Sequence, residues 1–443
     1  MTASTRIWRN WSGTAAASPA YRLAPRDESE VALAVQFASE RGLPVRAVGA
    51  GHSFTPAAVT DGVLLNLDRL AAVEKVEPTE DGALVTVGAG IRLGALNREL
   101  LARGFAMENL GDIDKQSIAG AISTGTHGTG ARFGGLPTQV AGLRIVGADG
   151  QLREVGPGDP LFEAGRLSLG AVGILTAVTL RVVPAFNLLA REEPWDLDEA
   201  LDSLEGPQGW WETEDHVDLY WFPFTRRAMV KRNTRLPLGE GPSMHPARRW
   251  LDDELLSNGV FEGVNRLATL SPRAVPRINA VSARALSART YAAPSAEVFA
   301  TPRRVVFREM EYAVPRADLR AVLEEIDAWL RRSHEPVPFP LEVRCARPDE
   351  VWLSTAHGRE SAYVAVHQYR KLRHSRYFAA AEAIFREAGG RPHWGKMHSL
   401  GTEELAALYP RFEDFLAVRR DADPEGLFAN PYTNRVLGRS GGA

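Results

Sequence analysis

The chain has 443 residues, of which 44% are hydrophobic and 24% charged, and this balance predicts a globular protein of two domains. Its formal net charge of −3 lacks the clustered basic excess of a nucleic-acid-binding protein. The single cysteine, Cys345, excludes an internal disulfide and a thiolate zinc site and favours a reduced, cytoplasmic location. We expect no secretory leader and no membrane span, because no apolar run has the required length.

The first 185 or so residues alternate short strands with a few helices. Apolar spacing over 29–42 predicts a helix that ends at Gly42, and residues 92–104 predict another that ends on a glycine. Strands are predicted over 43–49, 62–67, 83–90 and 174–184, and a hairpin over 140–155. This pattern is typical of an α+β fold, and we expect a domain boundary near residue 186.

Beyond residue 186 the pattern is less regular. Residues 307–314 predict a strand and 316–333 an amphipathic helix, whereas about 235–305 have weak periodicity. Aromatic residues gather at Trp210-Trp211 and over 220–224. These rings could form platforms for a sugar or part of the core, and the core is favoured.

A glycine-rich turn, Gly49-Ala50-Gly51-His52-Ser53, follows the strand over 43–49. Glycines let the backbone approach a ligand and present successive N–H groups to a pyrophosphate. A dinucleotide loop of the Rossmann type would open a helix, which Pro56 prevents here. The segment is therefore either a different kind of phosphate-binding turn or a plain connection between strands.

Two further segments are suited to a flat, polar, phosphate-bearing ligand. Residues 109–130 are dense in glycine, serine and threonine, yet apolar residues at 118–122 indicate an ordered segment. In residues 169–180, glycines precede a buried strand. The second half of the chain carries Glu342 and Arg344, which share one face of a strand, then residues 366–369, then His393-Trp-Gly-Lys396-Met-His398.

The glycine turn, the 109–130 segment, the His393–Lys396 segment and residues 423–432 occur together in this order. With them the chain resembles the vanillyl-alcohol-oxidase-type FAD family, in its sugar-lactone and alditol oxidase branch. The resemblance covers most of the chain and is weakest over about 190–305. It implies an FAD-binding domain over 1–186, a mixed-sheet substrate domain over 187–415, and a C-terminal segment, 416–443, that returns to the FAD domain.

In this family the matching histidine is bonded to the flavin 8α-methyl, so the resemblance implies a covalent link at His52; the alternative is that His52 only contacts the flavin edge. The resemblance implies these cofactor-binding residues: Gly49, Ala50, Gly51, His52, Ser53, Gly111, Ser117, Gly120, Ser123, Thr124, Gly125, His127, Gly130, Gly173 and Ile174.

The resemblance also implies roles at the substrate. Glu342 is expected to bind substrate hydroxyls, and Arg344 to stabilise negative charge at the flavin N1–C2 region. Lys396 is expected to hold or deprotonate the reacting hydroxyl while hydride passes to flavin N5. His367 is a further candidate in this pocket, and Ser117 could reach the substrate from the FAD domain.

The implied reaction is oxidation of a secondary hydroxyl of an aldono-1,4-lactone, with alditol oxidation at the primary C1 hydroxyl as the alternative. The resemblance places Gly111 beside the flavin edge, where a small residue leaves room for O2 and so favours O2 as the acceptor, giving H2O2; a lactone dehydrogenase with another acceptor is the alternative. A metallohydrolase built on His367, His393 and His398 is disfavoured, because no His-Glu-x-x-His spacing occurs, and no metal site is expected.

Overall fold

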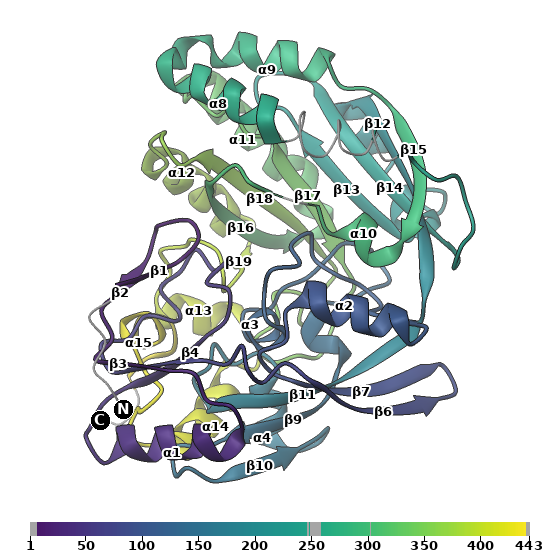
Figure 1. Cartoon of the computed structure of the whole chain (residues 1–443). Coiled ribbons are helices and arrows are strands. Elements are labelled where there is room, and N and C mark those ends of the chain that lie inside the picture. The colour runs from purple at the N-terminus through teal and green to yellow at the C-terminus, as the bar shows by residue number, and fades with distance from the viewer. Residues whose placement is uncertain (1–6, 246–247, 249–257, 302, 440–443) are drawn as a thin grey trace.

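A computed structural model describes residues 7–245, 248, 258–301 and 303–439 (Figure 1). Two large sheets dominate it, one in each half of the chain, with the helices packed around them. Residues 249–257, in the stretch for which the sequence predicts little regular structure, lie outside the described residues. Within the described residues, no helix combines the length and apolar character that crossing a membrane requires.

The N-terminal half contains a small parallel sheet and a larger antiparallel one. The parallel sheet has the order β3-β5-β4, with β3 (Tyr21–Leu23), β4 (Val45–Val48) and β5 (Val63–Asn66). The larger sheet has the order β10-β9-β11-β7-β6, and β8 pairs with β11. Its strands are β6 (Val73–Thr79), β7 (Gly82–Gly88), β8 (Phe105–Ala106), β9 (Val140–Val146), β10 (Leu152–Val155) and β11 (Ile174–Pro184). A two-residue pair, β1 (Trp8–Arg9) and β2 (Ala16–Ala17), precedes both sheets.

The predicted elements of this half are confirmed, with small shifts at their ends. The first helix is α1 (Glu28–Ser39), with Asp27 as its N-cap, and the second is α2 (Leu93–Ala102). The predicted hairpin is the antiparallel pair β9 and β10. Strand β6 is not predicted, because most of its side chains are exposed and no apolar alternation marks it.

The second half is built on an eight-stranded sheet with the order β15-β12-β14-β13-β17-β18-β16-β19. Its strands are β12 (Phe186–Asp196), β13 (His216–Trp221), β14 (Arg227–Pro237), β15 (Arg289–Pro294), β16 (Phe307–Pro315), β17 (Leu341–Ala346), β18 (Ser361–Tyr369) and β19 (Arg391–Pro392). Strand β11 ends at Pro184 in one sheet, and β12 begins at Phe186 in the other. The domain limits of 186 and 415 stay predictions.

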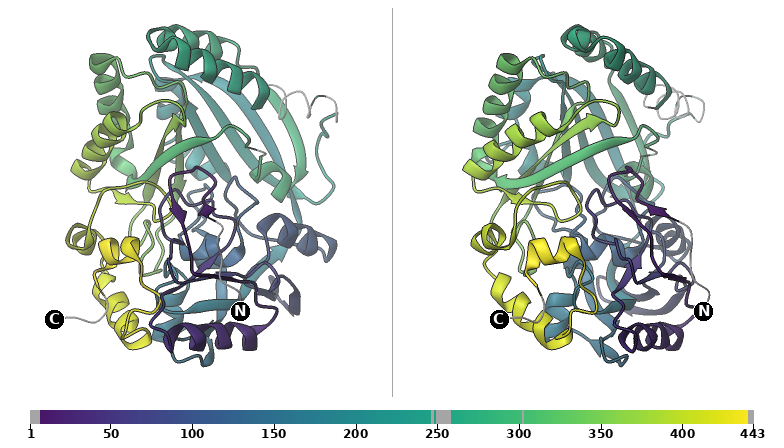
Figure 2. Two further views of the ribbon diagram at one scale, coloured as in Figure 1. Left: turned by 60° about the vertical axis from the view of Figure 1, so that its left-hand side comes forward. Right: turned by 90° about the vertical axis from the view of Figure 1, so that its left-hand side faces the viewer.

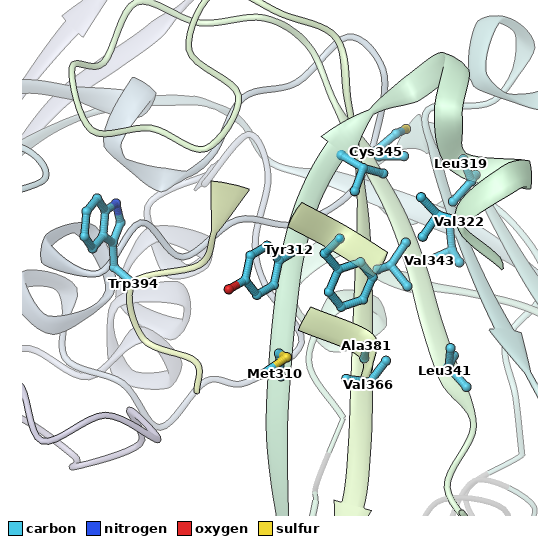
Figure 3. Packing of buried hydrophobic residues seen from close by; sticks show 14 of the residues in the cluster. Met310, Tyr312, Leu319, Val322, Leu341, Val343, Cys345, Val366, Ala381 and Trp394 are labelled. Carbon is cyan, nitrogen blue, oxygen red and sulfur yellow. The ribbon is translucent and has the colours of Figure 1, made fainter. Parts of the chain in front are cut away.

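One face of this sheet is apolar and packs against α11 (Leu319–Ser333) and α12 (Ser375–Glu387) (Figure 3). Met310 and Tyr312 of β16 and Val343 of β17 belong to this core, together with Val322 of α11. Side chains alternate across a strand, so the intervening residues of β13, β14, β16, β17 and β18 point to the opposite face. That face is lined with charged side chains.

The remaining helices close the two halves. They are α3 (Ile118–Ser123), η1 (Leu136–Gln139), α4 (Pro160–Gly165), α5 (Leu197–Asp202), α6 (Trp210–Thr213), α8 (Phe261–Leu270), η3 (Pro272–Ala274), α9 (Val275–Arg284), α10 (Ser295–Phe299), η4 (Arg316–Asp318), α13 (Thr402–Leu408), α14 (Phe412–Ala422) and α15 (Pro431–Leu437). Trp210, Trp211 and Trp221 are buried in the core, as favoured from the sequence.

The C-terminal helices lie against the N-terminal half, as Figure 2 shows in yellow and purple. The amide of Val45 in β4 donates to the carbonyl of Leu427 at 2.8 Å. The side-chain amide of buried Asn430 donates to the carbonyls of residues 56, 57 and 59, and its oxygen caps α15 through Thr433. These contacts hold in place the segment that follows the glycine turn.

Candidate functional site

Three hollows that share lining residues run from the N-terminal half to the charged face of the large sheet. The first, the trough, has a volume of about 120 Å³ and is lined by residues 46–53, 116–124 and 169–175. The second, the slot, about 50 Å³, shares His52 and Thr124 with the trough and reaches Arg344. The third, the cap cavity, about 310 Å³, shares Asp112 and Arg344 with the slot and lies over the charged face of the large sheet. This path can hold a long ligand whose end meets a second molecule in the cap cavity.

The glycine turn forms one wall of the trough. Gly51 has a φ of +67°, a conformation that favours glycine, and a Cβ at Gly49 would collide with the hydroxyl of Ser117. The backbone amides of residues 50–53 donate no hydrogen bond to any other residue that the structure describes. A run of amides without protein partners, beside a trough, is suited to a pyrophosphate. The residues present therefore fit the dinucleotide part of FAD.

His52 lies where the trough opens into the slot. Its ring stacks on Trp11 with centroids 5.4 Å apart. Burial, with the positive charges of Arg92, Lys115 and Lys396, lowers the pKa of His52 to about 4. The imidazole is therefore neutral near pH 7 and keeps the lone pair that a nucleophile needs.

Lys396 sits between two carboxylates of β16. Its ammonium pairs with Glu309 and lies 3.8 Å from Glu311. The loop that carries Lys396 is tied to the glycine turn, because the amide of Phe54 donates to the carbonyl of Gly395 at 2.7 Å. His127 reaches the same group from the 109–130 segment, with Nε2 3.1 Å from Glu311 and its ring stacked on Tyr363 at 3.7 Å. Three distant parts of the chain thus meet at one buried charge cluster.

These contacts fix the charges of the cluster. Burial would raise the pKa of Glu309, but Lys396 and His367 outweigh it and lower the pKa to about 2. Burial is likewise outweighed at Glu311, where His127 and Lys396 hold the pKa well below its ordinary value. Burial would lower the pKa of Lys396, but Glu309 and Glu311 raise it above its ordinary 10.5. Lys396 is thus an ammonium ion, which disfavours its predicted role as the group that removes a proton.

A second charge cluster centres on Arg344. Its guanidinium pairs with Glu342, lies 3.2 Å from Asp112 and donates from Nε to Asp218 at 3.0 Å. Burial would lower the pKa of Arg344, but these carboxylates raise it well above its ordinary value. Asp112 also pairs with Arg303, and both guanidinium groups hold its pKa below its ordinary value against the effect of burial. Arg344 is fixed at the junction of the slot and the cap cavity.

The structure brings most of the predicted site residues together. The trough is lined by Gly49, Ala50, Gly51, His52, Ser53, Ser117, Gly120, Ser123, Thr124, Gly173 and Ile174. The slot is lined by Gly111, His127, Arg344 and Lys396, and the cap cavity by Arg344 and His367. Gly125 lines none of the three hollows, and a Cβ there would lie 3.1 Å from the Leu167 side chain.

The predicted site residues Gly130 and Glu342 also lie outside the three hollows. Gly130 lines none of the three hollows, and its amide donates to the carbonyl of Cys345 in β17 at 3.0 Å. It therefore joins the two halves of the protein. Glu342 is buried and its carboxylate pairs with Arg344, so its contact with the substrate would run through that guanidinium.

Several site residues are absent from the sequence-based set. They are Trp11, Arg46, Asp112, Asp218, Lys231, Arg303, Glu309 and Glu311. Glu309 and Glu311 did leave a signal, since charged and apolar residues alternate in Glu309-Met-Glu-Tyr312. That pattern is also typical of a strand with one solvated face. Tyr220, within an aromatic group favoured as core, lines the cap cavity.

Among the described residues, His127, Glu311 and His393 lie close enough together to be considered as metal ligands. Their hydrogen bonds indicate otherwise. The amide of Gly395 donates to Nδ1 of His393 at 3.0 Å, which leaves the neutral ring with its proton on Nε2. The Lys396 ammonium already supplies a positive charge to Glu311. This group is better described as part of the charge cluster around Lys396.

Comparisons with known proteins place these features in context. A family model described as D-arabinono-1,4-lactone oxidase matches residues 178–436, and one described as FAD binding domain matches residues 19–156. The chain is 40% identical to an L-gulono-1,4-lactone dehydrogenase of Mycobacterium tuberculosis over 98% of this chain and 99% of the relative. It is 31% identical to the L-gulonolactone oxidase of Mus musculus over 97% and 98% of the two chains.

A Streptomyces alditol oxidase is 32% identical over 88% of this chain and 89% of its own. Among solved structures, cholesterol oxidase from B. sterolicum is similar in fold, with a TM-score of 0.80 and 19% identity over 97% of this chain and 96% of that one.

The charge cluster around Lys396 predicts a pH-dependent effect of Lys396→Met on stability. The substitution leaves Glu309 and Glu311 buried without their cation, which should cost about 3–5 kcal/mol near pH 8. In the wild type, the low pKa of Glu309 gives stability that is present above about pH 4.5 and lost as the pH falls toward 2. The variant should lack this dependence, so its deficit in unfolding free energy should shrink on acidification.

Urea unfolding of both proteins at several pH values measures this difference. Lys75→Met, at an exposed lysine paired with Glu77, is the control and should change stability by less than about 0.5 kcal/mol. Equal effects of the two substitutions would contradict the buried cluster.

Proposed function

Because the chain belongs to the sugar-lactone and alditol oxidase branch of the vanillyl-alcohol-oxidase-type FAD family, we propose that it oxidises the secondary C2 hydroxyl of an aldono-1,4-lactone. The protein is an FAD-dependent oxidoreductase. The observation that carries the proposal is the meeting of the slot with the cap cavity at Arg344, beside the Lys396 ammonium. Bound FAD supplies the acceptor for the hydride that leaves the substrate carbon.

In this proposal the chain's own residues bind and orient the cofactor and the lactone. The amides of residues 50–53 and the hydroxyl groups of Ser117, Ser123 and Thr124 would hold the cofactor in the trough. Arg344 places a fixed positive charge at the end of the slot, and this charge would stabilise a reduced, anionic cofactor bound there. Lys396 donates to the reacting hydroxyl oxygen, and Glu342 keeps the Arg344 guanidinium in place.

The lactone is favoured over an alditol by the relatives. The relatives named for lactones align with 98% and 97% of the chain, at 40% and 31% identity, whereas the alditol oxidase aligns with 88% of it at 32% identity. The cap cavity supports either substrate, because it combines aromatic residues such as Phe307 and Phe339 with charged ones such as Lys231.

A substrate panel tests the proposed substrate class. Under anaerobic conditions L-gulono-1,4-lactone should bleach the flavin absorbance, whereas xylitol and sorbitol should bleach it at least about ten-fold more slowly, a difference of ~1.4 kcal/mol in activation free energy. Stopped-flow absorbance at the flavin maximum gives both rates. Rapid bleaching by the alditols alone would contradict the lactone proposal.

O2 is the proposed electron acceptor, and Gly111 is the residue that supports it. Gly111 lines the slot, and a Cβ there would lie 3.1 Å from the carbonyl oxygen of His127 and 3.2 Å from the Thr126 methyl. Alanine would therefore crowd the slot. The relative named as a dehydrogenase favours the alternative, a lactone dehydrogenase with another acceptor.

An oxygen electrode and a dye assay on the same sample distinguish the two acceptors. With lactone present, the wild type should consume O2 and release H2O2, and Gly111→Ala should lower this rate about ten-fold. The rate at which the Gly111→Ala variant reduces the dye should stay near the wild-type rate. Fast dye reduction by the wild type without H2O2 would identify a dehydrogenase.

We also infer that FAD is attached covalently through His52. The neutral imidazole at the entrance to the slot supports this inference, because it can act as a nucleophile toward the flavin 8α-methyl. Acid-precipitated wild-type protein should retain its yellow colour, and His52→Ala should release it into the supernatant. Precipitated wild-type protein that loses its colour would show that His52 only contacts the flavin.

A further inference from the structure

We propose that Lys231 and Asp218 form the specificity-determining site of the cap cavity. They bind a hydroxyl group of the side chain that a six-carbon aldonolactone carries on C4: the ammonium donates to this hydroxyl, and the carboxylate accepts from it. This inference rests on the proposed function and names what the cavity recognises in its substrate.

The charged face of the large sheet carries a row of alternating charges across neighbouring strands (Figure 1). Glu192 of β12 is opposite Arg289 of β15 on one side and opposite Lys231 of β14 on the other. Lys231 is in turn opposite Asp218 of β13. Arg344 of β17 continues the row by donating to Asp218. Residues directly opposite each other share a face of the sheet, and all five line the cap cavity.

Lys231 is a buried cation that makes no ion pair with the carboxylates beside it, among the described residues. Opposite charges in register normally attract each other. The Glu192 carboxylate, however, is held by two nitrogens of Arg289, at 2.6 and 3.0 Å. The Lys231 ammonium donates instead to the carbonyl of Val298 at 2.6 Å. An ammonium has three hydrogens, so two remain for a ligand in the cavity.

Asp218 supplies an acceptor beside this donor. Its Oδ1 accepts from Nε of Arg344 at 3.0 Å, whereas Oδ2 accepts no hydrogen bond from any residue that the structure describes. Oδ2 is also not one of the enclosed atoms that lack a partner, and the side chain is 11% exposed, so this oxygen is open to the cavity. An ammonium can only donate and a carboxylate can only accept. A hydroxyl group does both and therefore satisfies the two residues together.

The position of this site fits the far end of the substrate. Adjacent strands lie about 4.8 Å apart, so Lys231 on β14 is two strands, or roughly 10 Å, from the strand that carries Arg344. Arg344 marks the junction of the cap cavity with the slot, where the proposed reaction takes place. In a 1,4-lactone the side chain on C4 leaves the ring on the side away from C2. A lactone whose C2 faces the slot therefore extends its side chain along the row toward Asp218 and Lys231.

A pair of lactones tests the site in flavin-loaded protein. L-gulono-1,4-lactone carries a diol on C4, and its 5,6-dideoxy analogue carries an ethyl group there. The wild type should prefer the diol by about 10- to 100-fold in kcat/KM for anaerobic flavin bleaching, because the ethyl group leaves the buried ammonium and carboxylate unpaired. In Lys231→Met this preference should fall below about three-fold, mainly through a higher half-saturating concentration of the diol lactone.

Two further variants separate recognition from a structural role. If Lys231 only anchors the carbonyl of Val298, its replacement weakens the use of both lactones alike and leaves the preference unchanged. Asp218→Asn keeps an oxygen for Arg344, replaces the open oxygen by an N–H donor and leaves Val298 bound, so it tests the site even if Lys231→Met does not fold. It should also lower the preference. Lys75→Met, at an exposed lysine, should keep the wild-type preference.

The outcomes distinguish this site from the proposed function. If the wild type bleaches with L-gulono-1,4-lactone but shows no preference for the diol, or if either folded variant retains the full preference, the inference is wrong and the proposed function stands. If neither lactone bleaches the wild-type flavin, the proposed function fails, and the site fails with it.

Discussion

The Lys396 ammonium lies between two carboxylates that the large sheet would otherwise bury without a counter-charge, and this interaction joins three parts of the chain. Glu309 and Glu311 come from β16, and Lys396 comes from the loop that hydrogen-bonds to the glycine turn. His127 completes the cluster from the 109–130 segment. Because buried charges are tolerated only when they are paired, these segments must come together for any of them to be stable. These segments also line the slot, which connects the trough to the cap cavity.

The requirement that buried charges be paired also explains why the two faces of the large sheet differ. Met310, Tyr312 and Val343 face the helices and supply hydrophobic stabilisation. The residues between them include Glu311 and Arg344, whose charge partners come in part from the N-terminal half. Asp112 and His127 are those partners, and both belong to the segment that lines the slot. Binding of the cofactor and pairing of the buried charges thus depend on the same contacts.

The sequence predicted the fold class and most of the trough, because glycine turns and the 109–130 segment leave local signals. The charge clusters were largely missed. Arg303 and Arg344 follow Asp112 by about 190 and 230 residues along the chain, and no local sequence pattern links either arginine to this aspartate. The strands β12 to β14 were also missed, since buried polar residues such as Lys231 and Asn233 obscure the alternation that marks a half-buried strand. The role of Lys396 in proton removal was inferred from resemblance, and its two carboxylate neighbours disfavour that role.

The most direct test is a crystal structure of the flavin-loaded protein with a bound aldono-1,4-lactone. The account predicts the flavin ring in the slot between His52 and Arg344, and the lactone in the cap cavity with its reacting hydroxyl within hydrogen-bond distance of Lys396. A flavin ring outside the slot, or a lactone bound away from the charged face of the large sheet, would contradict it.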